Sequence, residues 1–212
     1  MYSPGSFRVS DDAVVLPFIE CYDFATLITS TAKDGVLITH VPLFLKRSKD
    51  RAVLQGHVAK ANPHWRRFDG GTPSIAIFHG PHAYVSPAWY QNKPAVPTWN
   101  YAVVHAHGRP RITEDRQVTL DILQNLVRKN ERHRSEPWEM AELSPEYYEQ
   151  MASRIIAFEM PIDSIEAKFK LGQNRSEEDR EGTISGLLGA DSLDAAALAT
   201  FMREQSGING SD

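Results

Sequence analysis

The chain has 212 residues, of which 42% are hydrophobic and 24% are charged, and its formal net charge is −4. The length allows one or two domains with a full core, and the acidic balance argues against a protein that coats nucleic acid. The single cysteine, Cys21, excludes an intramolecular disulfide and a cysteine-based metal cage. No apolar run reaches the length of a membrane span and residues 1–5 lack a secretory pattern, so we expect a cytoplasmic protein.

The first predicted element is a short helix over residues 10–22. Its Ser-Asp-Asp start suits a helix N-terminus, because these side chains accept hydrogen bonds from free backbone N–H groups. Pro17 predicts a break or kink, and Cys21 is expected to be a small buried side chain. The residues expected to face the core are Val14, Val15, Phe18 and Ile19.

Strands are predicted along most of the chain, where β-branched and apolar residues alternate between turns rich in Gly, Pro and Asp. Asp34-Gly35 is a hairpin signal between the first two strands. Pro42 lies inside the second strand and cannot donate to a ladder, so one side there must be unpaired, bulged or turned. Thr39-His40 directly before it suggests a ligand edge, although a satisfied core Thr and a surface His would give the same pattern. The expected strands are 24–31, 36–46, 52–58, 74–79, 83–85, 99–109, 154–160 and 164–171.

The stretch from Leu54 to Trp65 combines the end of a strand with the start of a helix. Asn62-Pro63 supplies the helix start, with Asn62 as the cap and Pro63 at the first helical position. Lys60 lies between strand and helix, so this turn could hold an anion such as the phosphate of a flat cofactor. The alternative is an ordinary connection with solvated polar residues, because short anion motifs often match by chance.

Helices dominate the remainder of the chain. Residues 113–130 form the clearest one, and Ser176 with Asp179 gives a capping-box pattern for a later one. The further helices are expected over 144–153, 176–188 and 193–204, with a frayed tail over 207–212. About eight strands and five helices, joined mostly by short turns, predict a mainly β fold of the α+β class, an antiparallel barrel rather than a parallel sheet. The apolar face of the helix over 113–130 consists of Leu120, Ile122, Leu123, Leu126 and Val127.

Eight histidines raise the question of a metal site. His79 and His82 bracket a Gly-Pro turn, and His105 and His107 share a strand face, so each pair could offer imidazole ligands. No carboxylate pattern completes a site, and we assign no metal ligand. We also assign no catalytic residue, because Cys21 has no activating neighbour and the familiar nucleophile, phosphate-loop and dinucleotide motifs are absent.

Several short motifs, taken in order, resemble one family closely. They include Thr39-His40-x-Pro42-Leu43, Gly56-His57-Val58-Ala59-Lys60-Ala61-Asn62-Pro63, Phe78-His79-Gly80-Pro81-His82-Ala83-Tyr84, Val96-Pro97-Thr98-Trp99-Asn100-Tyr101 and Lys170-Leu171-x-Gln173-Asn174-Arg175. The chain resembles the PaiB-type FMN-binding negative transcriptional regulators, which have a flavin-binding split barrel like that of pyridoxamine phosphate oxidase. The resemblance implies an FMN-binding split-barrel domain over residues 1–188, followed by a C-terminal helix and tail (189–212) packed on the same domain or dimer. The loop over 92–95 is short for the family.

The resemblance also implies a homodimer with two FMN sites at the subunit interface. The strand over residues 39–43 would run along the isoalloxazine ring, and Lys60 would contact the phosphate. Residues near the C-terminal end would come from the other subunit. The implied FMN-binding residues are Thr39, His40, Val41, Pro42, His57, Val58, Ala59, Lys60, Asn62, Trp99, Asn100, Lys170, Gln173 and Asn174.

The function implied by the resemblance is negative regulation of transcription. The residues themselves give DNA binding little support, because the best helix-turn-helix candidate pairs residues 176–188 with 193–204. The second of these helices has Arg203 as its single basic residue, so it looks like a packing or dimer helix. The alternatives are an FMN-dependent oxidoreductase, in which flavin would carry the hydride, and a haem-binding or haem-handling protein.

Overall fold

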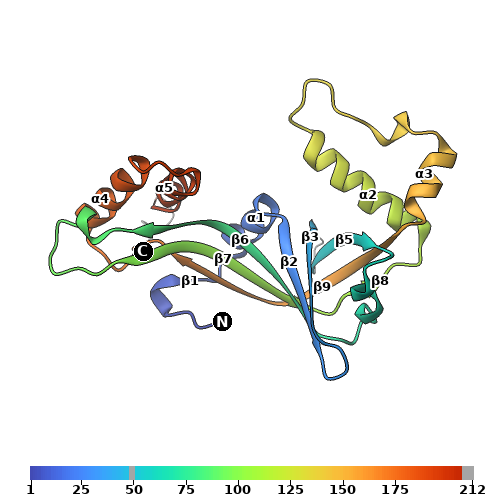
Figure 1. Ribbon diagram of the computed structural model, residues 1–212, viewed down its shortest axis with the longest axis horizontal. Helices are drawn as coiled ribbons and strands as arrows, with labels where there is room; N and C mark the ends of the chain where they lie inside the picture. Colours follow the sequence, from blue (N-terminus) through green and yellow to red (C-terminus); the bar gives the residue numbers. More distant parts are fainter. Residues whose placement is uncertain (48–50, 207–212) are drawn as a thin grey trace. The chain divides into compact units, whose positions relative to one another are not determined.

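The computed structural model describes residues 1–47 and 51–206, which contain nine strands and five α-helices (Figure 1). The strand order is β3-β2-β6-β7-β9-β5-β4, with β1 and β8 each paired to β9. The strands are β1 (Arg8–Val9), β2 (Phe24–Thr31), β3 (Gly35–Pro42), β4 (Phe44–Arg47), β5 (Ala52–Ala59), β6 (Ser74–Val85), β7 (Thr98–Gly108), β8 (Arg111–Ile112) and β9 (Ile155–Lys170). The α-helices are α1 (Asp12–Cys21), α2 (Arg116–Glu131), α3 (Pro145–Ala152), α4 (Glu177–Leu188) and α5 (Leu193–Ser206), and the 3-10 helices are η1 (Gly5–Phe7), η2 (Pro63–Arg67), η3 (Pro87–Trp89) and η4 (Met140–Glu142).

The chain forms two compact units, which we describe separately. The first unit contains residues 1–15, 79–104 and the described chain from residue 166 onwards, and the second contains residues 16–78 and 105–165. The long strands β6, β7 and β9 contribute residues to both units.

The β2–β3 hairpin is the most regular part of the second unit. Its antiparallel pairing runs from Thr31 opposite Gly35 to Phe24 opposite Pro42. Gly35 has φ of 71°, a left-handed conformation that glycine adopts without a steric penalty, so the Asp34-Gly35 turn signal is confirmed. Alternate residues of β2 point into the core, where they are fully buried. These residues are Ala25, Leu27 and Thr29.

Helix α2 packs against β4 and β5 in the same unit. Its buried residues Ile122 and Leu126 form a cluster with Ala157 of β9, and Phe44 and Val118 pack against this cluster. The predicted apolar face is wider than the buried one, because its other three members are only half-buried. The cap is Asp115, whose side chain accepts from the N–H of Gln117, so α2 begins at Arg116 rather than at residue 113.

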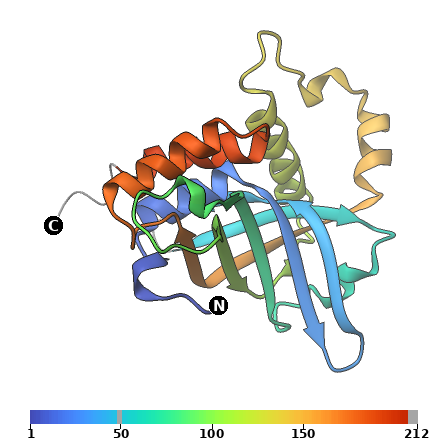
Figure 2. The same ribbon diagram turned by 60° about the vertical axis from the view of Figure 1, so that its left-hand side comes forward.

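In the first unit, α4 and α5 lie side by side (Figures 1 and 2). Helix α5 buries an apolar face made of Ala195, Leu198, Ala199, Phe201 and Met202, while Arg203 is exposed. Helix α5 therefore buries this face within the described chain, and its expected role in the domain or in a dimer stays a prediction. Ser176 caps α4 by accepting from the N–H of Asp179, but the Asp179 carboxylate accepts instead from the backbone of Gln91 and Asn92. The predicted reciprocal capping box is therefore only half formed.

Prolines misled the prediction of strand ends at two places. Residues 74–85 form one strand rather than two, and residues 155–170 do the same around Pro161. Pairing of β6 with β2 covers Ser74 to Ile77, so the missing N–H of Pro81 costs no hydrogen bond to β2. Conversely, the strand predicted over 36–46 divides after Pro42 into β3 and β4, as the proline suggested.

Several further expectations need correction or comment. Helix α1 continues through Pro17, whose ring is exposed, and Cys21 is exposed rather than buried. The helix expected after Asn62 is the five-residue 3-10 helix η2, in which Asn62 accepts from the N–H of His64 as predicted. The expected tail over 207–212 lies outside the described residues, and the domain boundary after residue 188 stays a prediction. No helix in residues 1–47 and 51–206 is both long and apolar enough to cross a membrane.

Candidate functional site

A buried histidine joins the predicted site residues Thr39 and Asn62. His64 is 2% exposed, and its Nδ1 and Nε2 lie 2.8 Å from the hydroxyls of Thr39 and Thr29 respectively. The Asn62 amide donates to the same Thr39 oxygen over 3.0 Å. The side chains of Thr39 and Asn62 therefore hold η2 against the β2–β3 hairpin, and their polar atoms are used within the fold.

Burial lowers the pKa of His64 and of His57. Both imidazoles therefore stay neutral to a lower pH in the folded chain than in the unfolded chain, which takes up protons below pH about 6.5. The free energy of unfolding should consequently fall as the pH is lowered from 7.5 to 5.5, by up to about 1.4 kcal/mol per pH unit for each proton. Urea titrations at both pH values measure this slope.

Substitution of one of these histidines tests its share of this loss. His57→Gln should reduce the loss of stability between pH 7.5 and 5.5, because it removes a group whose pKa burial lowers. Ser135→Gln, at an exposed position without a titratable side chain, is the control and should retain the wild-type loss. Equal stability of the wild-type chain at the two pH values would contradict the assignment.

The outward face of β3 is apolar and exposed. Phe24, Val36 and Ile38 are 65%, 60% and 58% exposed, and paired residues of β2 and β3 project to the same side. His40 and Pro42 share this face, and the His40 Nδ1 lies 3.1 Å from the Thr26 hydroxyl. Val41, which is buried, points the other way with Thr39. We call Phe24, Val36, Ile38, His40 and Pro42 the outer β2–β3 face.

Three basic residues lie close together along the backbone near the end of β5, where it pairs with β9. The Lys60 N–H donates to the Arg154 carbonyl over 2.7 Å, and the Trp65 indole donates to the Lys60 carbonyl over 2.9 Å. Arg66 lies over the Trp65 ring, with its Cζ 5.3 Å from the centroid. Among the described residues, neither the Lys60 ammonium nor the Arg154 guanidinium has a carboxylate partner. We call Lys60, Arg66 and Arg154 the basic corner.

His57, Val58 and Ala59 lead into this corner along β5. Val58 is buried, whereas Ala59 is exposed at the strand end. His57 pairs with Ala157, whose side chain packs beneath α2, so the imidazole lies on the α2 side of the sheet. Its Nδ1 is buried and has no hydrogen-bond partner in the described structure. Such an atom is costly to leave unpaired, which marks it as a place where a ligand or water can bind.

The remaining predicted residues lie in the first unit, and several are engaged there. Lys170 donates to the Thr98 hydroxyl, and the buried Asn100 amide contacts the Met202 sulfur over 3.8 Å. The Gln173 amide accepts from the Leu171 N–H over 2.8 Å and donates to the Phe169 carbonyl over 2.6 Å. Asn174 is exposed.

Trp99 is the most available aromatic residue of this set, since its side chain is 54% exposed. Its ring lies 6.4 Å from that of His82 and 6.3 Å from that of Tyr84. With Tyr101 and the His79-Gly80 backbone it borders a largely apolar cavity of about 360 Å³. A flat ring could stack here, and Trp99 is one of the residues that the family resemblance implies for FMN.

Sequence reasoning located the turn at Lys60 but missed the other two cations of the basic corner. Arg154 comes close only because Ala59 pairs with Ile155, a contact between residues far apart in the chain. Arg66 follows the expected helix start. No pattern in the sequence predicts that its guanidinium lies over the Trp65 indole. The alternation of residues 36–42 predicts which side chains share the outer β2–β3 face. It does not predict that this face is exposed.

Comparison with known proteins adds two kinds of likeness. The family model described as "Putative FMN-binding domain" matches residues 1–164. The chain is 33% identical over 205 residues to "Protease synthase and sporulation protein PAI 2" of Bacillus subtilis (strain 168), a match that covers 97% of this chain and 98% of that protein.

Solved structures show the same fold at low sequence identity. The flavocytochrome Anf3 from Azotobacter vinelandii matches with a TM-score of 0.59 and 16% identity, covering 82% of this chain and 75% of that one. The FAD and haem binding protein from Mycobacterium smegmatis matches with a TM-score of 0.57 and 16% identity, covering 81% and 78%. These matches confirm the predicted antiparallel split barrel of the α+β class.

Proposed function

Because the chain belongs to the FMN-binding domain family, and FMN is therefore its cofactor, we propose that it is a homodimeric FMN-binding regulator of transcription of the PaiB type. The observation that carries the proposal is the basic corner, where among the described residues Lys60 and Arg154 have no carboxylate partner, at the end of the strand that also carries the unpaired His57 imidazole nitrogen. FMN combines a phosphate with a flat apolar ring, so a site for it needs both kinds of surface.

The phosphate end of FMN suits the basic corner. Lys60 and Arg154 are held together through their backbones, as the 2.7 Å hydrogen bond between them indicates. Charged donors form stronger hydrogen bonds to phosphate than neutral ones do, and an exposed Lys beside two Arg side chains provides several. Helix η2 is short, so in this proposal the side chains supply most of the attraction.

The ring end of FMN and the second subunit suit the outer β2–β3 face. Exposed apolar faces on an edge strand commonly mark interaction sites. We propose that the ring lies along the backbone of residues 39–42 and that a second copy of the chain covers the remaining apolar side chains. In this arrangement, Trp99, Asn100, Lys170, Gln173 and Asn174 come from the partner subunit and close the site. Bound FMN would supply an absorbing, redox-capable ring.

A titration with FMN tests this proposal. Cofactor-free protein should take up one FMN per chain, with a shift in the visible absorption bands of the flavin and quenching of its fluorescence, because the ring enters a less polar site. Light scattering should give the mass of two chains. A monomer that binds no FMN would contradict the proposal, and a dimer without FMN uptake would remove its flavin part.

Addition of NADH or NADPH to the FMN-loaded protein distinguishes a regulator from an oxidoreductase. A regulator should leave the bound flavin oxidised when NADH or NADPH is added without oxygen. Rapid bleaching of the flavin bands by either nucleotide would instead favour the oxidoreductase. DNA binding, if direct, should weaken steeply with salt concentration, because phosphate contacts release counterions.

A further inference from the structure

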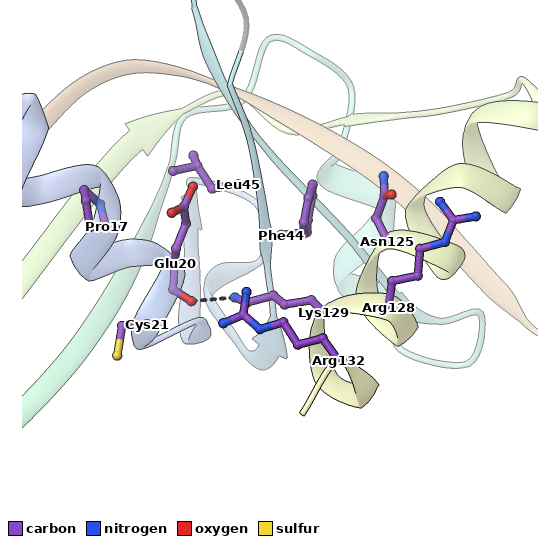
Figure 3. A pocket seen from close by; sticks show the side chains of 9 residues that line it. All are labelled: Pro17, Glu20, Cys21, Phe44, Leu45, Asn125, Arg128, Lys129 and Arg132. Atoms are coloured by element: carbon purple, nitrogen blue, oxygen red, sulfur yellow. Dashed lines mark hydrogen bonds between the residues drawn. The ribbon is translucent and has the colours of Figure 1, made fainter. Parts of the chain in front are cut away.

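A second cavity lies between α1, β4 and α2, and none of the residues that line it is assigned to FMN (Figure 3). Its volume is about 570 Å³, within the usual range of about 300–1,000 Å³ for small-molecule sites. All residues that line it belong to the second unit. We call it the α1–α2 pocket.

One wall of the α1–α2 pocket is cationic. Asn125, Arg128 and Arg132 follow one another at spacings of three and four residues, so they share a face at the C-terminal end of α2. The Arg132 Nε donates to the His133 imidazole over 2.8 Å, which leaves its terminal nitrogens available. Within the described chain, neither guanidinium has a carboxylate partner, and the half-buried Asn125 amide has no hydrogen bond.

The nearby acids do not neutralise this wall, because other cations already hold them. Lys129 extends from α2 toward α1, where its ammonium lies 2.5 Å from the Asp23 carboxylate and 2.6 Å from the Glu20 carbonyl (Figure 3). The Glu20 carboxylate in turn pairs with Arg47 over 2.9 Å. The Lys129–Asp23 and Arg47–Glu20 ion pairs are each neutral overall. The positive charges of Arg128 and Arg132 therefore remain as a local excess.

The opposite wall of the pocket is apolar. Phe44 lies between the two helices in Figure 3, with the buried Leu45 next to it in the chain and Pro17 on α1. Cations over apolar side chains suit a ligand with one anionic head and a flat or aliphatic body. Basic residues near a helix C-terminus also stabilise the helix, but this role does not require a cavity or an apolar wall.

We propose that the α1–α2 pocket binds a small organic acid, with its carboxylate on Arg128 and Arg132 and its apolar body against Phe44 and Pro17. Arginine is suited to this role because its planar guanidinium can donate two parallel hydrogen bonds to one carboxylate. Since this site is separate from the residues assigned to FMN, the ligand would be a second small molecule rather than the flavin.

Cys21 provides a built-in reporter for the test. It lines the pocket, it is exposed, and it is the single cysteine of the chain. Because the chain has no other thiol, alkylation by neutral N-ethylmaleimide, followed by mass spectrometry on the full chain with saturating FMN, reports on the Cys21 edge of this pocket. The probe ligand is 2-naphthoate, and uncharged 2-naphthalenemethanol is its neutral match.

We expect 2-naphthoate to slow alkylation of Cys21 about tenfold when its concentration is about ten times its dissociation constant, by simple mass action. The neutral alcohol should protect far less, and Arg128→Gln/Arg132→Gln should abolish protection by the acid. Arg203→Gln, at an exposed site on α5, is the control and should behave like the wild type. No protection by 2-naphthoate, or equal protection by acid and alcohol in the wild-type chain, would overturn the proposal whether or not the double variant folds.

Discussion

Replacing Lys60 with alanine should weaken FMN binding by about 10- to 100-fold, because a hydrogen bond to a charged group contributes about 1.5–3 kcal/mol. The Lys60 ammonium is exposed and, among the described residues, has no carboxylate partner, so its removal should not disturb the fold. The backbone contacts of this residue, to Arg154 and Trp65, are retained by alanine. Fluorescence titration with FMN measures the change in dissociation constant.

Riboflavin lacks the phosphate of FMN. Measuring the affinity of both ligands for the wild type and for Lys60→Ala therefore gives a thermodynamic cycle. Wild-type protein should prefer FMN to riboflavin, and Lys60→Ala should reduce that preference while leaving riboflavin affinity nearly unchanged. Lys46→Ala, at another exposed lysine, controls for net charge and should retain the preference. If Lys60→Ala weakens both ligands equally, Lys60 acts on the ring or on the fold rather than on the phosphate.

The proposed anion site depends on side-chain charges more than on a helix dipole. Sequence reasoning relied on a helix N-terminus after Asn62, whereas η2 is a 3-10 helix of five residues. A single short turn aligns few peptide dipoles, so its contribution is smaller than that of a full α-helix. In the proposed site Arg154 would supply the missing positive charge, and its position depends on pairing between β5 and β9, which no local pattern reveals.

The fold was more predictable than the site, and the errors have a common cause. Strand β2 and its hairpin turn matched the expected residues because alternation and the Asp-Gly signal are local. The expected strands stop on either side of Pro81 and of Pro161, whereas the structure has one continuous strand at each place. A proline ends a strand only where its missing N–H would have had a hydrogen-bond partner. That depends on which neighbouring strand lies beside it, a property of the whole sheet. Likewise, the helical pattern of α1 did not show that Cys21 is exposed at the edge of the α1–α2 pocket.

Gly108→Ala should destabilise the protein by about 3 kcal/mol or more, because overpacking costs about 1–3 kcal/mol even where side chains can adjust. A Cβ atom on Gly108 would lie 2.3 Å from the Pro161 carbonyl oxygen and 2.8 Å from the Met160 Cγ. The first of these neighbours is backbone, so relief requires β7 and β9 to separate rather than a side chain to rotate. Met160 is fully buried in the core, which leaves it little room to yield.

Gly5→Ala is the matched control, since a Cβ there would meet no atom within 4 Å. It should change the free energy of unfolding by less than about 0.5 kcal/mol, as surface substitutions usually do. Urea titration of both variants gives the two values directly. Similar small effects for both variants would mean that β7 and β9 lie further apart than described. A large loss confined to Gly108→Ala would instead establish that this glycine permits the close approach of the two strands, a requirement that the sequence alone does not reveal.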